Sequence, residues 1–455
     1  MTFGTVAGEE TFTPTVVAIV DLADDLPALS RTRPAGGTYG DAWVLVLDHG
    51  EPRAVALVPF DGNDLDPGRL RGKLEAALLE TPPAGHPLPS IADDALPFAS
   101  VVVPTTFERF DQLEACVEQL AHLDYPSYEV VVVDNRPGRP GGEAQRHRIA
   151  CLPHVRVVEE ACPGISAARN RGVAASTGSF VAFTDDDVRP HPAWLRRVGA
   201  RFVTDPGTTC VSGLVVPAEL ETVTQAWFED SGCGIDRNLF RYRYRALAAV
   251  SSSSGKPSGV GRRRFLVCRE GDDVGLTHSL YMLGPFGMGC NFAFRREFLK
   301  EMGGFDVALG AGTPARGGED IVLLVEVLFS GGTLAFEPSA IISHTHRRTS
   351  DELRDQVHGY GVGLTAAFTA LVWRDPRHLL GLLGVAMPAA RSVLALGRPS
   401  QTASPTTAAN PNRTGIGYPA YPRQLRRLQR LGMLTGPVAY GRSRWRFRIR
   451  VRKGP

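Results

Sequence analysis

The chain has 455 residues, of which 43% are hydrophobic and 22% charged, and its formal net charge is +2. This composition excludes a mostly disordered chain, and the lack of any uninterrupted apolar run of about 18 residues excludes a polytopic membrane protein. The seven cysteines are scattered and form no CxxC pair. Their pattern is typical of a reducing compartment and argues against a disulfide framework or a structural zinc site.

The first 80 residues have the pattern of a small α+β domain. Its strands are expected at 16–20, 43–47 and 54–58, and its helix at 70–79. Residues 81–97 are rich in Pro and Ala, which predicts a linker between this domain and the rest of the chain.

Residues 98–350 have the pattern of an α/β domain, because short apolar strands alternate with helical stretches. Strands are expected at 99–103, 130–133, 155–158 and 180–183, and helices at 110–123, 165–175 and 193–203. Strands that are apolar on both sides predict a mostly parallel sheet with helices on both faces. Ligands bind at the carboxyl ends of such strands, so the polar residues that follow them are the first site candidates.

Two regions depart from this alternation. Residues 217–283 are interpreted as an insertion with mobile loops, because 251–261 is rich in Ser and Gly. Residues 351–455 are expected to form a helical C-terminal region with a basic tail. Within it, the apolar run 379–390 is too short to span a bilayer. A buried core helix is the first interpretation of that run, and an interfacial helix is the alternative.

The strongest chemical signal is the run Asp185-Asp186-Asp187, directly after the expected strand 180–183. Adjacent carboxylates repel one another, and a divalent cation relieves that repulsion with the oxygen ligands it prefers. Such a cation can also bridge to a diphosphate and neutralise a leaving group. The alternative is a solvated turn whose aspartates cap the next helix.

Other polar residues at the same predicted edge suit a nucleotide. Asp134 ends a strand and can accept hydrogen bonds from a base or a ribose. Pro104, Thr106 and Arg109 follow the first strand of the domain, and Arg169 lies in a helix that opens close to the same edge. No GxGxxG follows the first strand, which disfavours a dinucleotide dehydrogenase.

Six short motifs run in order through this part of the chain. They are PTTFER, VVVVDN, GISAARNRG, FTDDD, GCNFAFRREFLKEMGGFD and GGEDIVLLVEVLFSGG. Each is loose alone, but together and in this order they are specific. Residues 98–348 thereby resemble the family-2 glycosyltransferases, which implies the Rossmann-like α/β architecture called GT-A. The N-terminal unit and the tail lie outside this resemblance.

The resemblance implies roles for the acidic residues near the strand ends. Asp134 would contact the nucleobase. Asp185 and Asp186 would address the ribose and the sugar diphosphate. Asp187, with Asp185 as a second candidate, would hold a Mn²⁺ or Mg²⁺ ion. The expected donor site consists of these acidic residues together with Pro104, Thr106, Arg109 and Arg169.

Glu319 and Asp320 are similar to the acidic pair at the start of a helix over the acceptor site. Asp320 would be the general base that deprotonates the acceptor hydroxyl, with Glu319 beside it. The alternative is a pair of helix-capping acids. Gly289, Asn291 and Gly318 are expected to shape the acceptor pocket.

Two histidines, His344 and His346, follow an apolar pair late in the domain. Strand alternation would place both imidazoles on one face. The resemblance implies that a late histidine completes the metal site, so both are candidate ligands. The alternative is a pair of surface histidines beside Arg347 and Arg348.

The end of the chain is strongly basic, with ten arginines, one lysine and no acid over 423–453. Residues 442–452 alternate strictly, so a strand would place six arginines on one face and apolar residues on the other. One interpretation is an edge strand docked by its apolar face. The other is a surface for anionic lipid or a polyprenyl-phosphate acceptor. No recognition motif for nucleic acid accompanies the charge.

These features predict a metal-dependent glycosyltransferase that moves a sugar from a nucleotide-diphosphate donor, with UDP-sugars as the first choice, to an acceptor hydroxyl. The acceptor would be a glycan or lipid-linked molecule in cell-envelope assembly. The resemblance implies inversion, and the absence of a QxxRW motif favours a single transfer over processive synthesis. A cytoplasmic location is expected, with peripheral contact at the inner face of the membrane. The alternatives are a nucleotidyltransferase and a non-catalytic nucleotide-sugar-binding scaffold.

Overall fold

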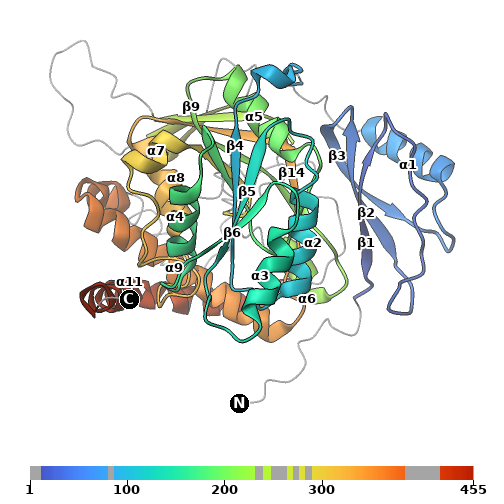
Figure 1. Ribbon diagram of the computed structural model, residues 1–455. Coiled ribbons are helices and arrows are strands. Elements are labelled where there is room, and N and C mark those ends of the chain that lie inside the picture. Colours follow the sequence, from blue (N-terminus) through green and yellow to red (C-terminus); the bar gives the residue numbers. More distant parts are fainter. Residues whose placement is uncertain are drawn as a thin grey trace, which may run out of the picture.

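The computed structural model describes residues 12–79, 87–230, 239–246, 264–269, 276–281, 289–384 and 421–453. Figure 1 shows a small sheet with one helix, a large α/β body, and a pair of long helices along the lower end of the molecule. Residues 251–261, in which mobile loops are predicted, lie outside the described residues.

The small N-terminal sheet has two apolar faces with different partners. It consists of β1 (Thr15–Asp21), β2 (Asp41–Asp48) and β3 (Glu51–Pro59), followed by α1 (Pro67–Leu79). β2 pairs in parallel with β1 and antiparallel with β3. On one face, residues such as Val44 pack with Leu70 and Leu74 of α1. On the other, Trp43 and Leu45 join the core of the large body.

A buried ion network also joins the two parts. Glu51 of β3 accepts hydrogen bonds from Arg197 at 3.0 Å and from Arg241 at 2.6 Å. Arg241 donates in turn to both carboxylate oxygens of the fully buried Glu337, each at 2.8 Å. Burying charges is stabilising only when each has its partner. The N-terminal sheet therefore completes a network that lies within the large body.

The large sheet begins with four parallel strands and continues as a mixed sheet. The parallel strands lie in the order β6 (Val155–Glu159), β5 (Tyr128–Asp134), β4 (Ala99–Thr105) and β7 (Phe180–Phe183). Beyond β7 come β13 (Phe292–Arg295), β9 (Thr208–Pro217), β14 (Thr333–His344), β10 (Tyr242–Ala246), β11 (Arg264–Arg269) and β12 (Leu276–Ser279), with β8 (Val188–Pro190) paired to the end of β14. β14 is parallel to β9, whereas β13, β8, β10, β11 and β12 pair antiparallel.

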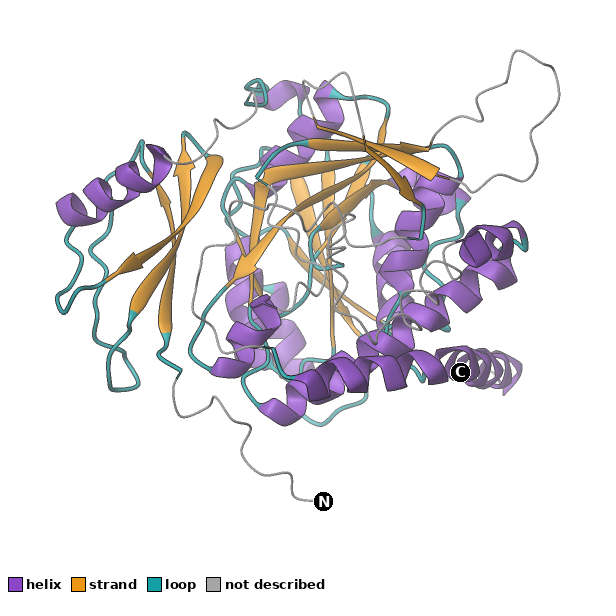
Figure 2. Ribbon diagram, turned by 180° about the vertical axis from the view of Figure 1, so that it is seen from behind, coloured by secondary structure: helices purple, strands orange, loops and turns teal. Residues whose placement is uncertain are grey.

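Helices cover both faces of this sheet, as the apolar strands predict (Figure 2). One face carries α2 (Phe110–Leu120), α3 (Gly142–Ala150) and α5 (Trp194–Thr204). The other carries α4 (Ile165–Ala175), α7 (Arg296–Glu301) and α8 (Glu319–Phe329). The expected α/β class is confirmed. The antiparallel strands come from the chain after Phe183, beyond the last of the four strands that the alternation predicts.

Two long helices of the described C-terminal residues are in close contact, α9 (Ser350–Arg374) and α11 (Arg423–Lys453). A Cβ at Gly361 of α9 would lie only 2.0 Å from the backbone oxygen of Gln429, and one at Gly432 would lie 2.3 Å from that of His358. These glycines thus let the two backbones touch. In the described part of the chain, no helix combines the length and hydropathy needed to cross a bilayer.

The strand interpretation of 442–452 is wrong, because these residues belong to α11. Arginine is a good helix former, and its alternation with apolar residues does not prevent helix formation once one side is packed. That packed side includes Tyr440, whose hydroxyl donates to Asp306 at 2.7 Å, and the buried Ser443.

The buried-helix interpretation of 379–390 is wrong for its described part. Residues 377–384 are helical, but Leu379, Leu380 and Leu383 are 47–52% exposed. Residues 385–390 lie outside the described chain.

Candidate active site

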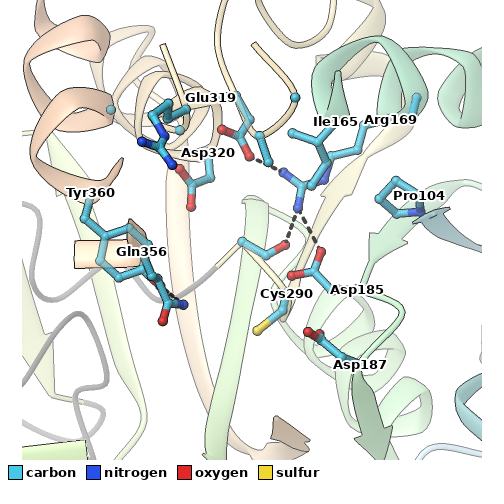
Figure 3. A pocket seen from close by; sticks show the side chains of 18 of the residues that line it. Pro104, Ile165, Arg169, Asp185, Asp187, Cys290, Glu319, Asp320, Gln356 and Tyr360 are labelled. Carbon is cyan, nitrogen blue, oxygen red and sulfur yellow. Dashed lines mark hydrogen bonds and ion pairs between the residues drawn. The ribbon is translucent and has the colours of Figure 1, made fainter. Parts of the chain in front are cut away.

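A cavity of about 640 Å³ lies at the carboxyl ends of β4 and β7. Its walls bring together most of the predicted site residues: Pro104, Thr106, Arg109, Arg169, Asp185, Asp186, Asp187, Gly289, Gly318, Glu319, Asp320 and His344. These residues come from motifs up to 240 positions apart, and the sheet places them around one space. Figure 3 shows the acidic run on one side of this cavity and Asp320 on the other.

Arginine side chains relieve part of the repulsion within the acidic run. Arg109 donates to Asp187 and to Asp186, each at 2.6 Å, and Thr105 donates to Asp186 at 2.7 Å. Burial, only partly offset by Arg109, raises the pKa of Asp186 to about 6. The run is therefore a partly buried charge cluster held by basic partners, not the solvated turn of the alternative interpretation.

Asp185, Asp187 and His344 form a cluster suited to a divalent cation. Each offers a ligand atom, and these atoms lie within 4.8 Å of one another. Asp187 Oδ1 is buried, accepts no hydrogen bond, and lies 3.4 Å from His344 Nε2. Burial opposes its ionisation, but His344 and Arg109 outweigh burial and lower the pKa of Asp187. A buried, charged and unpartnered oxygen beside an imidazole fits a Mn²⁺ or Mg²⁺ ligand set.

His346 lies behind His344 and does not reach the cavity, so its prediction as a direct ligand is not supported. The two Nδ1 atoms are 3.2 Å apart, and His346 Nε2 lies 2.5 Å from Glu229 Oε1 in α6 (Val223–Asp230). With Glu229 ionised, His346 donates through Nε2 and accepts through Nδ1. His344 then donates through Nδ1, so that its Nε2 would give up its proton and offer a lone pair to a cation bound beside Asp187. No sequence motif marked Glu229.

We expect Glu229→Gln to weaken Mn²⁺ binding by about 10–100-fold, the range for partners that orient a metal-ligating histidine. The reason is that a neutral amide fixes the tautomer of His346, and through it that of His344, less strongly. Calorimetric titration of the purified protein with Mn²⁺ measures this effect. Glu114→Gln is the matched control, because Glu114 of α2 pairs with Arg148 and does not line the cavity. Equal affinities in both variants would mean that Glu229 only packs.

Arg169 is a fully buried crosslink between the two sides of the cavity. Its guanidinium donates to Glu319 at 2.9 Å, to the Gly289 carbonyl at 3.0 Å and to Asp185 at 3.3 Å (Figure 3). Phe292 lies beneath it, with the ring centroid 5.3 Å away. The sequence predicts that this arginine contacts the donor, whereas in the structure its charge is already shared by two carboxylates.

The acidic pair at the start of α8 divides into an inward and an outward residue. Glu319 turns toward Arg169, and burial, followed by the neighbouring Asp320 carboxylate, raises its pKa to about 7. Asp320 is half-buried and faces Gln356 and Tyr360 across the cavity (Figure 3). A side chain at Gly289 would approach Asp320 Oδ2 to 2.9 Å, so this glycine keeps the carboxylate accessible.

The entry to α8 requires a glycine for two reasons. Gly318 has a φ of 87°, in the left-handed region, and a Cβ there would lie 2.3 Å from the carbonyl oxygen of Gly363 in α9. Backbone contact between the two helices thus fixes the position of Asp320. Gly318 lines the cavity with its backbone, and its place in an acceptor pocket stays a prediction.

Two predicted site residues face elsewhere. Asp134 is fully buried and accepts from Arg139 at 2.8 Å and Arg146 at 2.9 Å, while its neighbour Asn135 lines the cavity. The amide of Asn291 is used inside the sheet, where it accepts from Trp194 Nε1 and donates to two backbone carbonyls. Asn291 is therefore a structural residue and not part of the acceptor pocket.

One wall of the cavity was not predicted from the sequence. It includes Arg316, Arg347, Gln356, Tyr360 and Gln429. The two arginines adjoin recognised motifs and could have been proposed from that position. The other three come from α9 and α11, where no motif marks them and only the packing of the helix pair brings them to the cavity.

Residues 100–303 match the model of the family described as glycosyl transferase family 2. This part of the chain is a family-2 glycosyltransferase domain. The resemblance seen in the motifs is confirmed, and the family-2 domain contributes the acidic run and the residues that follow β4. The acidic pair of α8, His344 and the C-terminal helices lie beyond the matched residues.

Two curated relatives show how far the similarity extends. Glycosyltransferase AglE of Haloferax volcanii is 33% identical over 123 residues, which is 26% of this chain and 40% of that protein. Pre-mycofactocin glycosyltransferase of Mycobacterium tuberculosis is 28% identical over 194 residues, or 43% of this chain and 32% of the relative. The chain thus spans less than half of the length of either relative.

Among solved structures, a mannosyltransferase from Pyrobaculum calidifontis in complex with GDP-Man and Mn²⁺ aligns over 76% of this chain and 89% of its own, at 19% identity and a TM-score of 0.44. Glucosyl-3-phosphoglycerate synthase from Mycobacterium tuberculosis aligns over 64% and 86%, at 20% identity and a TM-score of 0.36. Both TM-scores lie below 0.5, so these alignments do not identify a donor or a metal for this chain.

Proposed function

We propose that this protein is a metal-dependent glycosyltransferase that moves a sugar from a nucleoside-diphosphate donor to an acceptor hydroxyl. The observation that carries the proposal is a single cavity whose walls hold both an Asp-Asp-His cluster and the outward carboxylate of Asp320. A scaffold that only binds the donor has no need of a half-buried carboxylate aimed into the same space.

The donor side of the cavity is the region around the acidic run. A divalent cation bound by Asp185, Asp187 and His344 would stabilise the negative charge of the departing nucleoside diphosphate. Thr106 and Asn135 line this side and offer polar groups to the nucleoside. Arg109 also lines this side. A bound diphosphate would take the place of Asp186 and Asp187 as the partner of its guanidinium.

The acceptor side is the region around Asp320. Its carboxylate takes the proton of the acceptor hydroxyl while the acceptor oxygen bonds to the anomeric carbon. The bond from that carbon to the diphosphate oxygen breaks, and its electron pair leaves with the nucleoside diphosphate. This single displacement inverts the anomeric centre. Because the sequence has no QxxRW motif, we propose a single transfer and not processive synthesis. We propose a UDP-sugar as the donor and a cell-envelope glycan or glycolipid as the acceptor.

Thermal shifts with UDP, GDP and dTDP, each with and without Mn²⁺, test the donor class. We expect one nucleotide to stabilise the protein only when Mn²⁺ is present, by about 2.7 kcal/mol at a ligand concentration 100 times Kd. Mn²⁺ alone and nucleotide alone are the controls. A protein that none of the three nucleotides stabilises, with or without metal, would contradict the proposed function.

A further inference from the structure

The side of α11 that faces away from α9 carries large apolar side chains. Leu431, Leu434, Val438 and Trp445 are between 55% and 77% exposed. Their spacing of three, four and seven residues places them along one side of the helix. Trp373, near the end of α9, is 63% exposed and lies against the guanidinium of Arg444. Proteins seldom leave contiguous apolar side chains of this size exposed without a partner.

Arginines surround these apolar residues. Those exposed on α11 are Arg423, Arg426, Arg427, Arg430, Arg442, Arg446 and Arg448. No acidic residue occurs anywhere in 423–453. We call the four apolar residues and these arginines the outer face of α11. Its charge complements a negatively charged partner, and its apolar strip needs an apolar medium directly beneath that charge. A free phosphate offers only the charge, and a nucleic acid adds base faces for stacking but no apolar medium for leucine and valine side chains.

We propose that the outer face of α11 binds the surface of an anionic lipid bilayer, with the helix lying in the interfacial plane. An interfacial helix has low overall hydrophobicity, an apolar strip and flanking basic residues, and aromatic side chains at the level of the headgroups. Each arginine near an anionic surface strengthens binding by a factor of about five. Leu379, Leu380 and Leu383, which follow α9 in the chain, are exposed apolar side chains as well.

The inner face of the same helix belongs to the cavity. Gln429 of α11 lines it, together with Gln356, Tyr360 and Leu364 of α9. A bilayer on the outer face would therefore lie about one helix diameter, roughly 10 Å, from a wall of the site. Figure 2 shows the α9–α11 pair as the lower edge of the molecule.

Vesicle co-sedimentation of the full chain tests the proposal without donor or metal. We expect binding to mixed phosphatidylcholine–phosphatidylglycerol vesicles that weakens as salt rises, and little binding to pure phosphatidylcholine. Leu434→Gln/Val438→Gln is expected to weaken binding by at least about tenfold, and Arg427→Gln/Arg430→Gln by about 25-fold.

The matched control is Leu79→Gln, which changes an 89% exposed leucine at the end of α1 and should bind like the wild type. Melting temperature and metal-dependent nucleotide binding report whether each variant keeps its fold. Wild-type protein that does not bind anionic vesicles would overturn the proposal. Self-association in solution that the α11 variants abolish would overturn it too. If the protein binds vesicles but no nucleotide, the proposed glycosyltransferase function fails and the proposal of membrane binding by α11 holds.

Discussion

Asp320→Asn is expected to lower the transfer rate by about 10²–10⁴-fold, the usual contribution of a positioned general base. The asparagine has nearly the same shape but cannot take the proton of the acceptor hydroxyl. The proposed donor and Mn²⁺ site lies on the opposite wall of the cavity, so the dissociation constants of both ligands should change by no more than about a factor of two. Single-turnover transfer from labelled donor, measured beside calorimetric donor binding, separates the two effects.

Asp351→Asn is the matched control for this experiment. Asp351 also lies in the first turn of a helix, α9, but its side chain is 92% exposed and remote from the cavity walls. If Asp320 served only to complement the helix dipole, both variants would lose about 0.3–1 kcal/mol of stability and no activity. An Asp320→Asn protein with the wild-type rate would contradict the proposed base.

Asp187→Asn is expected to weaken Mn²⁺ binding by more than about 100-fold, beyond the cost of removing an orienting partner. The asparagine loses the charge of the one carboxylate that faces both Asp185 and His344. The Mn²⁺-dependent stabilisation of the protein by nucleotide should then be lost in this variant as well. Titration with Mn²⁺, followed by electron paramagnetic resonance of the free ion, measures the affinity directly.

Asp111→Asn, an exposed acid in the first turn of α2, is the control for the general loss of one negative charge. In the Asp187→Asn variant, Arg109 loses one of its two carboxylate partners, which could destabilise the fold. Circular dichroism shows whether the variant remains folded. Unchanged Mn²⁺ affinity in a folded variant would show that the Asp-Asp-His cluster is not the cation site.

The sequence identified the parts of the site that follow strands or open helices. The acidic run follows β7 and the acidic pair opens α8, and both positions are visible as apolar runs that end in charge. Local patterning sufficed there because the ends of neighbouring strands and helices meet at one edge of the sheet.

The rest depended on contacts between distant segments. The role of His346 is set by Glu229, which lies 117 positions earlier, and Gln429 reaches the cavity only because Gly361 and Gly432 let α9 and α11 touch. The helical state of the tail depended in the same way on packing, since its alternation suits a strand equally well. Asp134 and Asn291 both lie in motifs that carry the resemblance, but buried partners hold both side chains.

The ion network around Glu51 ties the start of the chain to the transferase body. Trp43 fills space that the body would otherwise leave open, and Glu51 helps to neutralise Arg241, which in turn neutralises Glu337 inside β14. The same strand ends at His344. β2 and β3 are thus no detachable accessory, because they share a buried core and an ion network with the strand that carries a proposed cation ligand. Substitutions in these two strands are therefore expected to disturb the proposed cation site through β14.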